Sequence, residues 1–546
     1  MRHYLETFLD TATGNWNRKA LSDYNGEDFS YSDVMAQILG MHRAFRSYSI
    51  KKGDRVAICG RNSARWAISF FATATFKAVA VPILYDFTAE AVQHLLQHSQ
   101  SSVVFTDFRT FSRLDTSALP DLKVAVSLEN FTILWSRSED PMIGPFFENA
   151  SLAEASSYAS SLKGDLSGME ELAVINYTSG TTGEPKGVML PVRSISANVA
   201  YSIEHMPLPK DPHSLSMLPL AHMFGLSMEL LYPLSGGSHV TFISRPPSPS
   251  VLMDVFRKVR PYVLVTVPLV MEKIVKGKVM PALENPRVKW MLRVPVLKNL
   301  VMRKAGARLM QALGGRVMAI PMGGAALNPE VERLLKLMGI PYVVGYGMTE
   351  CGPLVAYEDP WNFRQGSCGK QLGGNLGLLR IDSQDPLREP GEIQVKGDIV
   401  TMGYFRNPEA TASAFTLDGW FKTGDLGIMD KSGNLTIKGR IKLMILSSNG
   451  QNIYPEEIEA RINNVDFVEE SLVTEKQGRL VALVYPKYDV PVQRIKSFLG
   501  ELNAQLPSFS RIHSIILRDQ PFEHTPKQSI KRSLYQNMHE TSVQSR

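Results

Sequence analysis

The sequence predicts an α/β fold with a large N-terminal domain and a smaller C-terminal domain. Helical and strand patterns alternate over roughly the first 170 residues, as expected for βαβ units that build a parallel sheet. From Gly391 onward the pattern changes to short strands separated by Gly and Asp turns, which predicts a β-rich part. A chain of 546 residues is also long enough to divide into more than one domain.

The elements of the first part follow from hydrophobic periodicity and from capping residues. Ser30 suits the N-cap position, so a helix is expected to begin at Tyr31. Because the stretch 136–168 is rich in Ser, Gly and Pro, it is expected to be a surface connection. Helices are predicted over 31–48, 62–78 and 88–98, and strands over 55–59, 80–83 and 102–105.

Later elements are predicted in the same way. Asn328 is expected to cap a helix that has Pro329 at its first position. Strands are predicted over 262–268, 316–322, 342–344, 470–474 and 480–485, and helices from 269 and over 455–463.

Composition limits the class of protein. The 59 basic and 53 acidic residues give a net charge of +6, which suits a phosphate-bearing substrate and is too diffuse to indicate nucleic-acid binding. The three cysteines have no metal-ligand spacing, which favours a reducing cytoplasm. The apolar runs are shorter than the ~20 residues that cross a bilayer. We therefore expect a cytoplasmic protein that is at most membrane-peripheral.

A loop rich in glycine and hydroxyl residues carries the strongest chemical signal. It follows a predicted strand at 172–175 and precedes a predicted helix at 194–206. Glycines let successive backbone N–H groups turn inward to bind an anion, and a lysine adds a positive charge. A flexible surface turn is the alternative. The candidate polyphosphate ligands are Thr178, Ser179, Gly180, Thr181, Thr182, Gly183 and Lys186.

The spacing of this loop differs from that of the mononucleotide P-loop. Only two residues separate Gly180 from Gly183, and Pro185 precedes the lysine. The stretch from Tyr177 to Val188 instead resembles the phosphate loop of the AMP-forming adenylating enzymes. That superfamily includes acyl-CoA synthetases, the adenylation domains of peptide synthetases and firefly-type luciferases. The resemblance implies that the loop holds the β- and γ-phosphates of ATP.

Two further motifs follow in the order of this superfamily. The stretch 217–225 resembles a signature in which a histidine lines the carboxylate pocket, which implies this role for His222. A histidine beside apolar residues is more often part of the core, and that alternative stays open. The stretch 323–326 resembles the segment on which adenine lies, with Gly324 and Ala325 as candidate contacts.

The hexapeptide 345–350 resembles the adenine- and magnesium-binding signature. The resemblance implies that Tyr346 stacks on adenine and that Glu350 holds Mg²⁺ through a carboxylate oxygen. Gly345, Gly347 and Thr349 belong to the same candidate site. All of these loops follow predicted strand ends, where open α/β sheets bind ligands.

The C-terminal motifs imply a mobile small domain. Asp425 lies where the superfamily has an aspartate that accepts both ribose hydroxyls, and Arg440 where an arginine contacts ribose or phosphate. Lys442 lies at the hinge, although Leu443 and Met444 depart from the usual hinge sequence. The implied domains are 1–438, a large multi-subdomain part with mostly parallel sheets and a β-rich subdomain, and 439–546, a small mobile α+β domain.

One departure bears on catalysis. The superfamily has a lysine near its C-terminus that reaches the α-phosphate and the substrate carboxylate, but Ser529 occupies that place here. Lys527 lies two residues earlier and points the same way if the loop is extended, so we take it as the substitute. Lys531 and a true loss of the lysine are the alternatives.

The sequences of two stretches favour a medium- or long-chain fatty acid as the substrate. Residues 218–225 and 268–274 resemble long-chain acyl-CoA synthetases. The basic amphipathic segment 285–311 is interpreted as a solvated helical hairpin, with a surface that touches membrane as the alternative.

The resemblance implies ATP-dependent activation of a carboxylic acid through an acyl-adenylate to acyl-CoA, with release of AMP and pyrophosphate. The catalytic candidates are Lys186, His222, Glu350 and Lys527, and the expected partners are a fatty acid, ATP, Mg²⁺ and coenzyme A. Two alternatives remain. The enzyme could load a carrier protein, or the chain could bind ATP or acyl-adenylate with little turnover because of Ser529.

Overall fold

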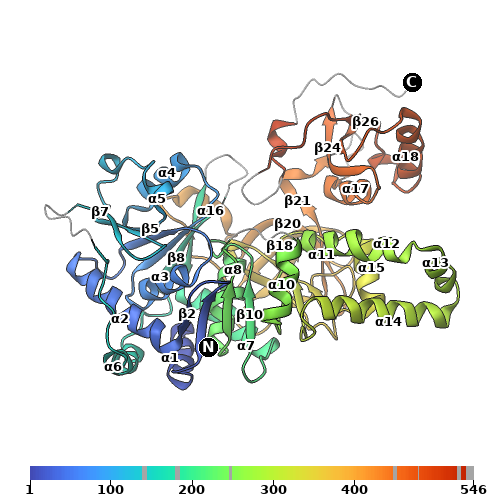
Figure 1. Ribbon diagram of the computed structural model, residues 1–546. Helices are drawn as coiled ribbons and strands as arrows, with labels where there is room; N and C mark the ends of the chain where they lie inside the picture. The colour runs from blue at the N-terminus through green and yellow to red at the C-terminus, as the bar shows by residue number, and fades with distance from the viewer. Residues whose placement is uncertain are drawn as a thin grey trace. The chain divides into compact units, whose positions relative to one another are not determined.

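The computed structural model describes residues 1–137, 144–178, 185–244, 249–446, 452–476, 479–524 and 530–535. The chain divides into two compact units (Figure 1). The first comprises Met1–Leu327, Val331–Leu378 and Val395–Phe421, and the second comprises Asn328–Glu330, Leu379–Gln394 and Lys422–Arg546.

An eight-stranded sheet forms the centre of the first unit, in the order β19-β9-β8-β4-β3-β5-β6-β7. Its inner strands are parallel and the edge strands are antiparallel. Every residue of β4, β5 and β6 is buried, as expected for strands covered on both faces. The parallel strands are β3 (Arg55–Cys59), β4 (Val79–Ile83), β5 (Ser101–Thr106), β6 (Val124–Ser127) and β8 (Leu172–Thr178); β7 is Ile133–Ser136, β9 is Lys186–Pro191 and β19 is Gly403–Tyr404.

The helices between these strands begin where the capping residues predict. Ser30 accepts a hydrogen bond from the backbone of Asp33, whose side chain accepts one in return, so α2 (Tyr31–Ser47) opens with a capping box. Ser63 caps α3 (Ala64–Thr75), and Thr88 caps α4 (Ala89–Ser99). The predicted alternation of helices and strands is confirmed.

Besides a sheet of β14 (Tyr346–Gly347), β15 (Leu354–Tyr357) and β16 (Lys370–Gln371), two smaller sheets complete the strands of this part. One has the order β10-β11-β1-β2, built from β10 (His213–Ser216), β11 (His239–Phe242), β1 (Lys19–Asp23) and β2 (Asp28–Ser30). The other pairs β12 (Ile320–Met322) with β13 (Tyr342–Val344) in parallel. The strand predicted at 262–268 is wrong, because this stretch forms only isolated bridges, from Val263 to Ala319 and from Thr266 to Met322.

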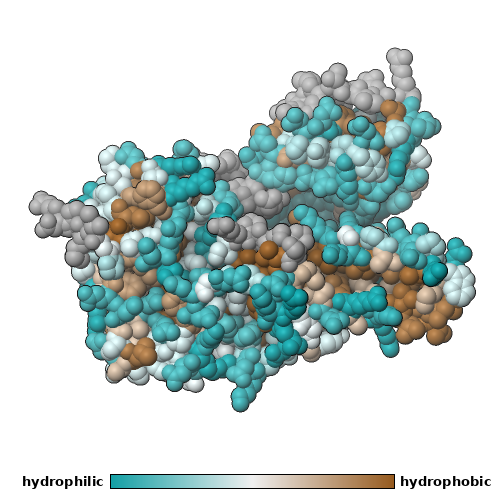
Figure 2. All heavy atoms as spheres, in the orientation of Figure 1, coloured by the Kyte–Doolittle hydropathy of each residue, from teal (hydrophilic) through white to brown (hydrophobic). Residues whose placement is uncertain are grey.

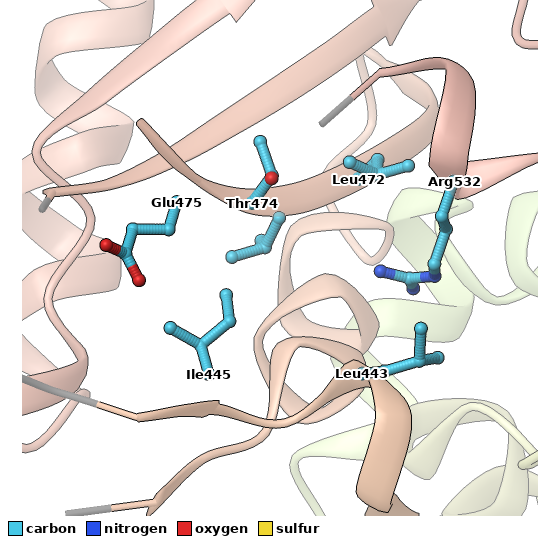
Figure 3. Close-up of a pocket in the computed structure, with 7 residues that line it drawn as sticks. Leu443, Ile445, Leu472, Thr474, Glu475 and Arg532 are labelled. Carbon is cyan, nitrogen blue, oxygen red and sulfur yellow. The ribbon is translucent and has the colours of Figure 1, made fainter. Parts of the chain in front are cut away.

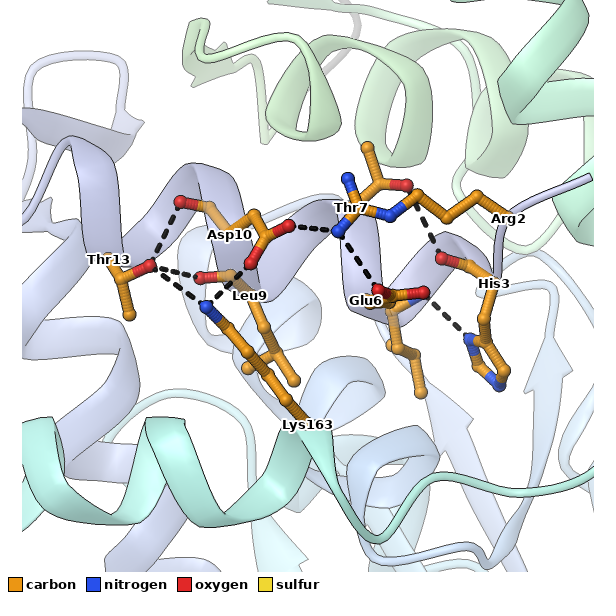
Figure 4. A network of polar contacts seen from close by, with 9 residues as sticks. Arg2, His3, Glu6, Thr7, Leu9, Asp10, Thr13 and Lys163 are labelled. Atoms are coloured by element: carbon orange, nitrogen blue, oxygen red, sulfur yellow. Dashed lines mark hydrogen bonds and ion pairs between the residues drawn. The ribbon is translucent and has the colours of Figure 1, made fainter.

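Two elements lie where the sequence analysis expected only loops or connections. Residues expected to form only a surface connection include α6 (Leu152–Lys163), which opens with a capping box between Ser151 and Glu154. Lys163 at its end forms an ion pair of 2.6 Å with Asp10 of α1 (Tyr4–Gly14), as Figure 4 shows. The strand β9 was likewise expected to be part of the loop that follows β8.

The second unit is β-rich near its start and α+β toward its end. One sheet has the order β17-β18-β20-β21, and a three-stranded sheet has the order β24-β25-β26. Ile458, Ile462, Val484 and Ile515 belong to its own apolar core. The elements are β17 (Leu378–Asp382), β18 (Gly391–Lys396), β20 (Phe421–Met429), β21 (Leu435–Arg440), β22 (Ile445–Leu446), β23 (Asn452–Ile453), α17 (Pro455–Ile462), β24 (Val468–Lys476), β25 (Arg479–Pro486), α18 (Val492–Ala504) and β26 (Ser514–Leu517).

The α/β class with a large N-terminal part and a smaller C-terminal part is thus confirmed, whereas the boundary at 438 and 439 stays a prediction.

The segment 285–311 forms the predicted pair of helices, α13 (Pro286–Leu292) and α14 (Pro295–Ala312). Within the described ranges, none of the helices combines the length and the hydropathy needed to cross a membrane. The remaining elements include α5 (Phe108–Phe111), α7 (Val192–His205), α8 (Met223–Gly225), a π-helix (Leu226–Leu231), α9 (Tyr232–Ser235), α10 (Pro249–Val259), α11 (Pro268–Ile274), α12 (Met280–Leu283), α15 (Pro329–Met338), β14 (Tyr346–Gly347), β15 (Leu354–Tyr357), β16 (Lys370–Gln371) and α16 (Pro408–Ala414).

Candidate active site

The glycine-rich stretch connects two paired strands, β8 and β9. Thr178, the last residue of β8, lies opposite Lys186, the first residue of β9, in an antiparallel register. The Thr178 hydroxyl lies 3.5 Å from the Lys186 carbonyl oxygen. Both ends of the connection are therefore held by the central sheet. The predicted ligands Ser179, Gly180, Thr181, Thr182 and Gly183 lie outside the described residues.

Tyr404 brings two predicted catalytic residues together. The Lys186 ammonium lies 5.0 Å from the centre of the Tyr404 ring. The Tyr404 hydroxyl donates a hydrogen bond of 3.1 Å to a carboxylate oxygen of Glu350. A cation above an aromatic face is attracted by the ring quadrupole. One phenol thus links the lysine at the start of β9 to the carboxylate predicted to hold magnesium, although these residues are far apart in the sequence.

The strand that carries Tyr404 is fastened on both sides. β19 pairs with β9, so that Tyr404 lies opposite Val188. The Thr401 backbone N–H donates to the Glu350 carbonyl at 2.8 Å, and its hydroxyl donates to the Met189 carbonyl at 2.6 Å. The Phe405 N–H donates to the Gly187 carbonyl at 2.7 Å. These bonds hold β9, Glu350 and Tyr404 in one rigid arrangement.

The raised pKa of Tyr404 suits its role as a hydrogen-bond donor. Burial, followed by the negative charge of Glu350, raises the pKa of Tyr404 well above that of a free tyrosine. The phenol therefore keeps its proton at neutral pH and donates to the carboxylate. Sequence reasoning missed this residue, because Gly403-Tyr404 carries no signal beyond a short strand after a turn.

The turn that carries Glu350 is shaped by a glycine. Thr349–Cys351 forms a single 3₁₀ turn that ends at Gly352, whose φ of +69° is in the left-handed region. A Cβ atom at Gly352 would lie 2.5 Å from the Ser194 hydroxyl. Asn198 of α7 donates to the Cys351 carbonyl at 2.9 Å and accepts from the Leu354 N–H at 2.8 Å. The helix that follows β9 thus supports the carboxylate turn.

The donor set at Glu350 fits magnesium. Mg²⁺ is usually held by one or two carboxylates together with substrate phosphates and water, rather than by an all-protein cage. The described residues contain no group of three or more His, Cys, Asp or Glu side chains that could form such a cage. The half-buried carboxylate of Glu350, linked through Tyr404 to Lys186, is a simpler arrangement that fits such an ion.

The two glycine-containing loops predicted to contact adenine follow parallel strands. Gly323–Ala325 follows β12, and Gly345–Gly347 follows β13, with the Gly345 N–H donating to the Met322 carbonyl at 2.8 Å. Gly324 has a φ of +87° and no atom within 4 Å of the position of a Cβ. Both loops therefore leave the carboxyl ends of neighbouring strands, the usual place for a ligand in an open sheet.

The residues of these loops differ in exposure. Gly324 and Ala325 are exposed, Gly345 and Thr349 are half-buried, and Gly347 is exposed. A Cβ at Gly347 would lie 2.4 Å from the Pro353 carbonyl oxygen, so only glycine fits there. Tyr346, the predicted stacking partner of adenine, is 9% exposed.

His222 directly precedes the short helix α8 and is half-buried. The adjacent Phe224 ring lies 3.4 Å from the position of a Cβ at Gly323. The histidine segment therefore lies beside the predicted adenine loop.

Buried side chains that the sequence did not single out hold the backbone before His222. Asn62 donates to the Leu218 carbonyl at 2.7 Å and accepts from the Leu220 N–H at 2.9 Å. Glu229 accepts from the Met217 and Leu218 N–H groups at 2.9 and 2.8 Å. Burial raises the pKa of Glu229 well above its usual value. Glu229 lies in the π-helix, an irregularity that often marks functional sites.

The second unit contains the predicted ribose contacts. Asp425 on β20 lies opposite Arg440 on β21, and the two side chains form an ion pair of 3.0 Å. The Asp425 side chain is 7% exposed and that of Arg440 is 55% exposed. Lys442 is exposed in the 3₁₀ turn Ile441–Leu443 that follows β21. Lys527 and Ser529 lie outside the described residues.

The second unit also has a pocket of about 240 Å³, and its lining includes Leu443, the residue that follows Lys442. Figure 3 shows the Glu475 carboxylate and the Arg532 guanidinium at opposite ends of the pocket, with Leu443 and Ile445 on its wall. None of the predicted nucleotide contacts among the described residues lines it.

An open α/β sheet with glycine-rich loops at its strand ends is typical of nucleotide-binding α/β enzymes. Comparison with known proteins gives the family. The model of the AMP-binding enzyme family matches residues 8–405, and that of the AMP-binding enzyme C-terminal domain matches residues 443–545. The chain belongs to the AMP-binding enzyme family. The predicted relationship to AMP-forming acyl-CoA synthetases is confirmed.

Curated relatives agree with this assignment. The chain is 30% identical over 478 residues to the long-chain-fatty-acid–CoA ligase FadD15 of Mycobacterium bovis, a match covering 82% of this chain and 75% of that protein. It is 28% identical over 491 residues to the human long-chain-fatty-acid–CoA ligase 1, covering 84% and 70% of the two chains.

Solved structures support the fold. ATP-bound MatB from Rhodopseudomonas palustris matches with a TM-score of 0.75 at 23% identity, over 97% of this chain and 98% of that chain. The O-succinylbenzoate coenzyme A synthetase of Bacillus subtilis, in complex with ATP and magnesium ion, matches with a TM-score of 0.76 at 21% identity, over 97% and 99% of the two chains. The fold of an AMP-forming acid–CoA ligase is thereby confirmed, and the individual site residues stay predictions.

Proposed function

We propose that this protein activates a medium- or long-chain fatty acid with ATP and transfers the acyl group to coenzyme A. The observation that carries the proposal is the placement of Lys186, Tyr404 and Glu350 together, with Lys186 opposite Thr178 at the end of the β8–β9 pair where the glycine-rich stretch connects the two strands. The relatives named as long-chain-fatty-acid–CoA ligases support the choice of acid.

The first half-reaction forms an acyl-adenylate. The carboxylate oxygen of the acid attacks the α-phosphorus of ATP, the bond to the pyrophosphate oxygen breaks, and pyrophosphate leaves. Lys186 would bind the phosphate chain and neutralise charge as pyrophosphate departs. Glu350 would hold Mg²⁺, which supplies further charge neutralisation on the phosphates when bound. Tyr404 would orient the Glu350 carboxylate through its hydrogen bond.

The nucleoside end has separate candidate contacts. Gly324, Ala325 and Tyr346 would contact adenine, and Asp425 would accept the ribose hydroxyls, since a carboxylate offers two acceptor oxygens to a diol. His222 would line the pocket of the acid. In the second half-reaction the thiol of coenzyme A attacks the acyl carbonyl carbon and AMP leaves. A rotation of the small domain at Lys442 would separate the two steps.

Exchange of labelled pyrophosphate into ATP tests the proposal. We expect exchange that depends on added acid and rises from acetate to palmitate. Lys186→Met should reduce exchange by about a hundredfold, because a charged transition-state contact is lost. The exposed Lys210→Met serves as the control. A preference for acetate or an aryl acid would refute the choice of substrate.

One sequence observation supports a second candidate. Ser529 stands where relatives of the superfamily have a lysine, so the chain could bind ATP or acyl-adenylate with little turnover. Measurable ATP binding without any acid-dependent exchange would favour this candidate. Transfer to a carrier protein in place of coenzyme A is a further possibility for the second step, and it is tested by omitting coenzyme A. The expected location is the cytoplasm, with peripheral contact to a membrane.

A further inference from the structure

The tip of the α13–α14 hairpin exposes large apolar side chains. Trp290 is 63% exposed, Val296 is 78% exposed and Leu300 is 60% exposed. Figure 2 shows hydrophobic side chains gathered where Figure 1 draws α13 and its connection to α14. Side chains of this size rarely stand together in water without a partner, so the tip has the character of a contact surface.

The same segment is strongly and uniformly basic. No Asp or Glu occurs between Asn285 and Pro329. Among the described residues, no ion pair involves a basic side chain of α13 or α14. The exposed basic residues are Arg287, Lys289, Arg293, Arg303, Lys304 and Arg308. Their positive charge therefore remains available to an anionic surface.

The other end of the hairpin belongs to the body of the first unit. Met302 and Leu309 of α14 are buried in the apolar core that also contains Met322 and Val344. Met322 ends β12 and Val344 ends β13, and these strands lead into the predicted adenine loops. The hairpin thus has an anchored base connected to the candidate site and an unpartnered tip.

We propose that the tip of the α13–α14 hairpin docks on the surface of an anionic lipid bilayer. Trp is favoured at the boundary between headgroups and acyl chains, and Val and Leu can enter that boundary. The surrounding Lys and Arg side chains are attracted to anionic headgroups within a Debye length. A protein partner would need acidic groups around an apolar pocket. An anionic bilayer supplies negative charge at its headgroups and an apolar region directly below them. This inference rests on exposure and charge and does not depend on the proposed reaction.

Vesicle flotation of the full chain tests this proposal. The probes are vesicles of phosphatidylcholine alone and vesicles of phosphatidylcholine mixed with phosphatidylglycerol. We expect binding to the mixed vesicles, little binding to the neutral ones, and a loss of binding at high salt. Equal binding to both kinds of vesicle, or to neither, would overturn the proposal.

Two variants separate the apolar and the charged contributions. Trp290→Ser with Val296→Ser removes the apolar tip, and Arg287→Gln with Lys289→Gln and Arg293→Gln removes nearby charge. Each should weaken partition into mixed vesicles about tenfold. The matched control is Trp361→Ser, because Trp361 is 74% exposed elsewhere on the chain and should not matter.

The remaining outcomes are also decisive. Loss of binding in the charge variant with no change in the tip variant would overturn the bilayer contact in favour of a general polyanion site. A wild-type dimer in sedimentation that Trp290→Ser with Val296→Ser dissociates would assign the surface to a second copy of the chain. Unchanged unfolding midpoints of the variants would show that the exposed substitutions leave the fold intact.

Discussion

The hydroxyl of Tyr404 donates a hydrogen bond of 3.1 Å to the carboxylate of Glu350, and the same ring lies 5.0 Å below the Lys186 ammonium. The three residues come from β9, a 3₁₀ turn and β19, and backbone hydrogen bonds hold these segments together. A predicted magnesium ligand and a predicted phosphate ligand therefore share one positioning residue.

Tyr404→Phe should raise the Mg²⁺ concentration needed for half-maximal pyrophosphate exchange by about five- to thirtyfold. The substitution removes one hydrogen bond to a charged group, and its net contribution is on the order of 1–2 kcal/mol. The ring remains beneath Lys186, so ATP binding without Mg²⁺ should change little. Tyr404→Leu also removes the ring and should weaken ATP binding as well. An unchanged Mg²⁺ requirement in Tyr404→Phe would contradict the positioning role.

Asp425→Asn should raise the KM for ATP by about tenfold or more, because the ribose acceptor and the partner of Arg440 are both weakened. The specific test uses 2′,3′-dideoxy-ATP. The wild type should discriminate strongly against this analogue, and Asp425→Asn should lose most of that discrimination. If the variant discriminates as well as the wild type does, Asp425 does not bind the ribose hydroxyls.

Lys527→Ala should reduce pyrophosphate exchange by about a hundredfold if Lys527 replaces the lysine of the superfamily. Thioester formation from a supplied acyl-adenylate should be affected much less, because the lysine would act in the first half-reaction. Ser529→Lys should preserve or raise exchange. Full activity of Lys527→Ala would show that this assignment is wrong and would direct attention to Lys531.

Buried histidines should make the protein less stable in mild acid. His42 is fully buried, and its ring nitrogens lie 2.6 Å from the Tyr158 hydroxyl and 2.8 Å from the Ala72 carbonyl. Burial lowers the pKa of His42 from 6.5 to about 4. Below pH 6.5, His42 therefore binds a proton in the unfolded chain, whereas it stays neutral in the folded chain until the pH approaches 4.

The sign of this effect follows from proton binding. The contribution of His42 to the free energy of unfolding is fully present above pH 6.5. It decreases by up to about 3 kcal/mol as the pH falls toward 4. The unfolding midpoint should decrease between pH 7 and pH 5, and it should decrease less in His42→Gln. Part of the dependence should remain in the variant, since burial also lowers the pKa values of His3 and His239 to about 4. Equal pH dependence in wild type and variant would contradict this explanation.

Local signals in the sequence predicted much of the fold. Ser30 followed by Asp33 is a capping pair, and it opens α2 where expected. Asn328 followed by Pro329 predicted the start of α15 in the same way. In contrast, β9 was missed because its glycine and lysine continue a loop-like composition, and its strand character comes from pairing with β8 and β19.

The candidate site was predictable where residues follow strand ends and was not predictable where the fold supplies contacts. Gly324 and Gly347 could be named because the stretches that contain them resemble signatures of the superfamily and follow predicted strand ends, where open α/β sheets bind ligands. Tyr404, Asn62 and Glu229 could not, since only the folded chain brings them to Glu350 and to the segment before His222. The sequence alone does not show which group a buried polar side chain will bind in the folded protein.

In the proposed reaction, this chain joins a fatty-acid carboxylate to the α-phosphate of ATP. The most direct measurement incubates the protein with ATP, Mg²⁺, coenzyme A and palmitate whose carboxylate carries heavy oxygen, followed by mass spectrometry of the nucleotide product. We expect AMP that contains one oxygen from the carboxylate. Unlabelled AMP, or ADP as the product, would contradict it.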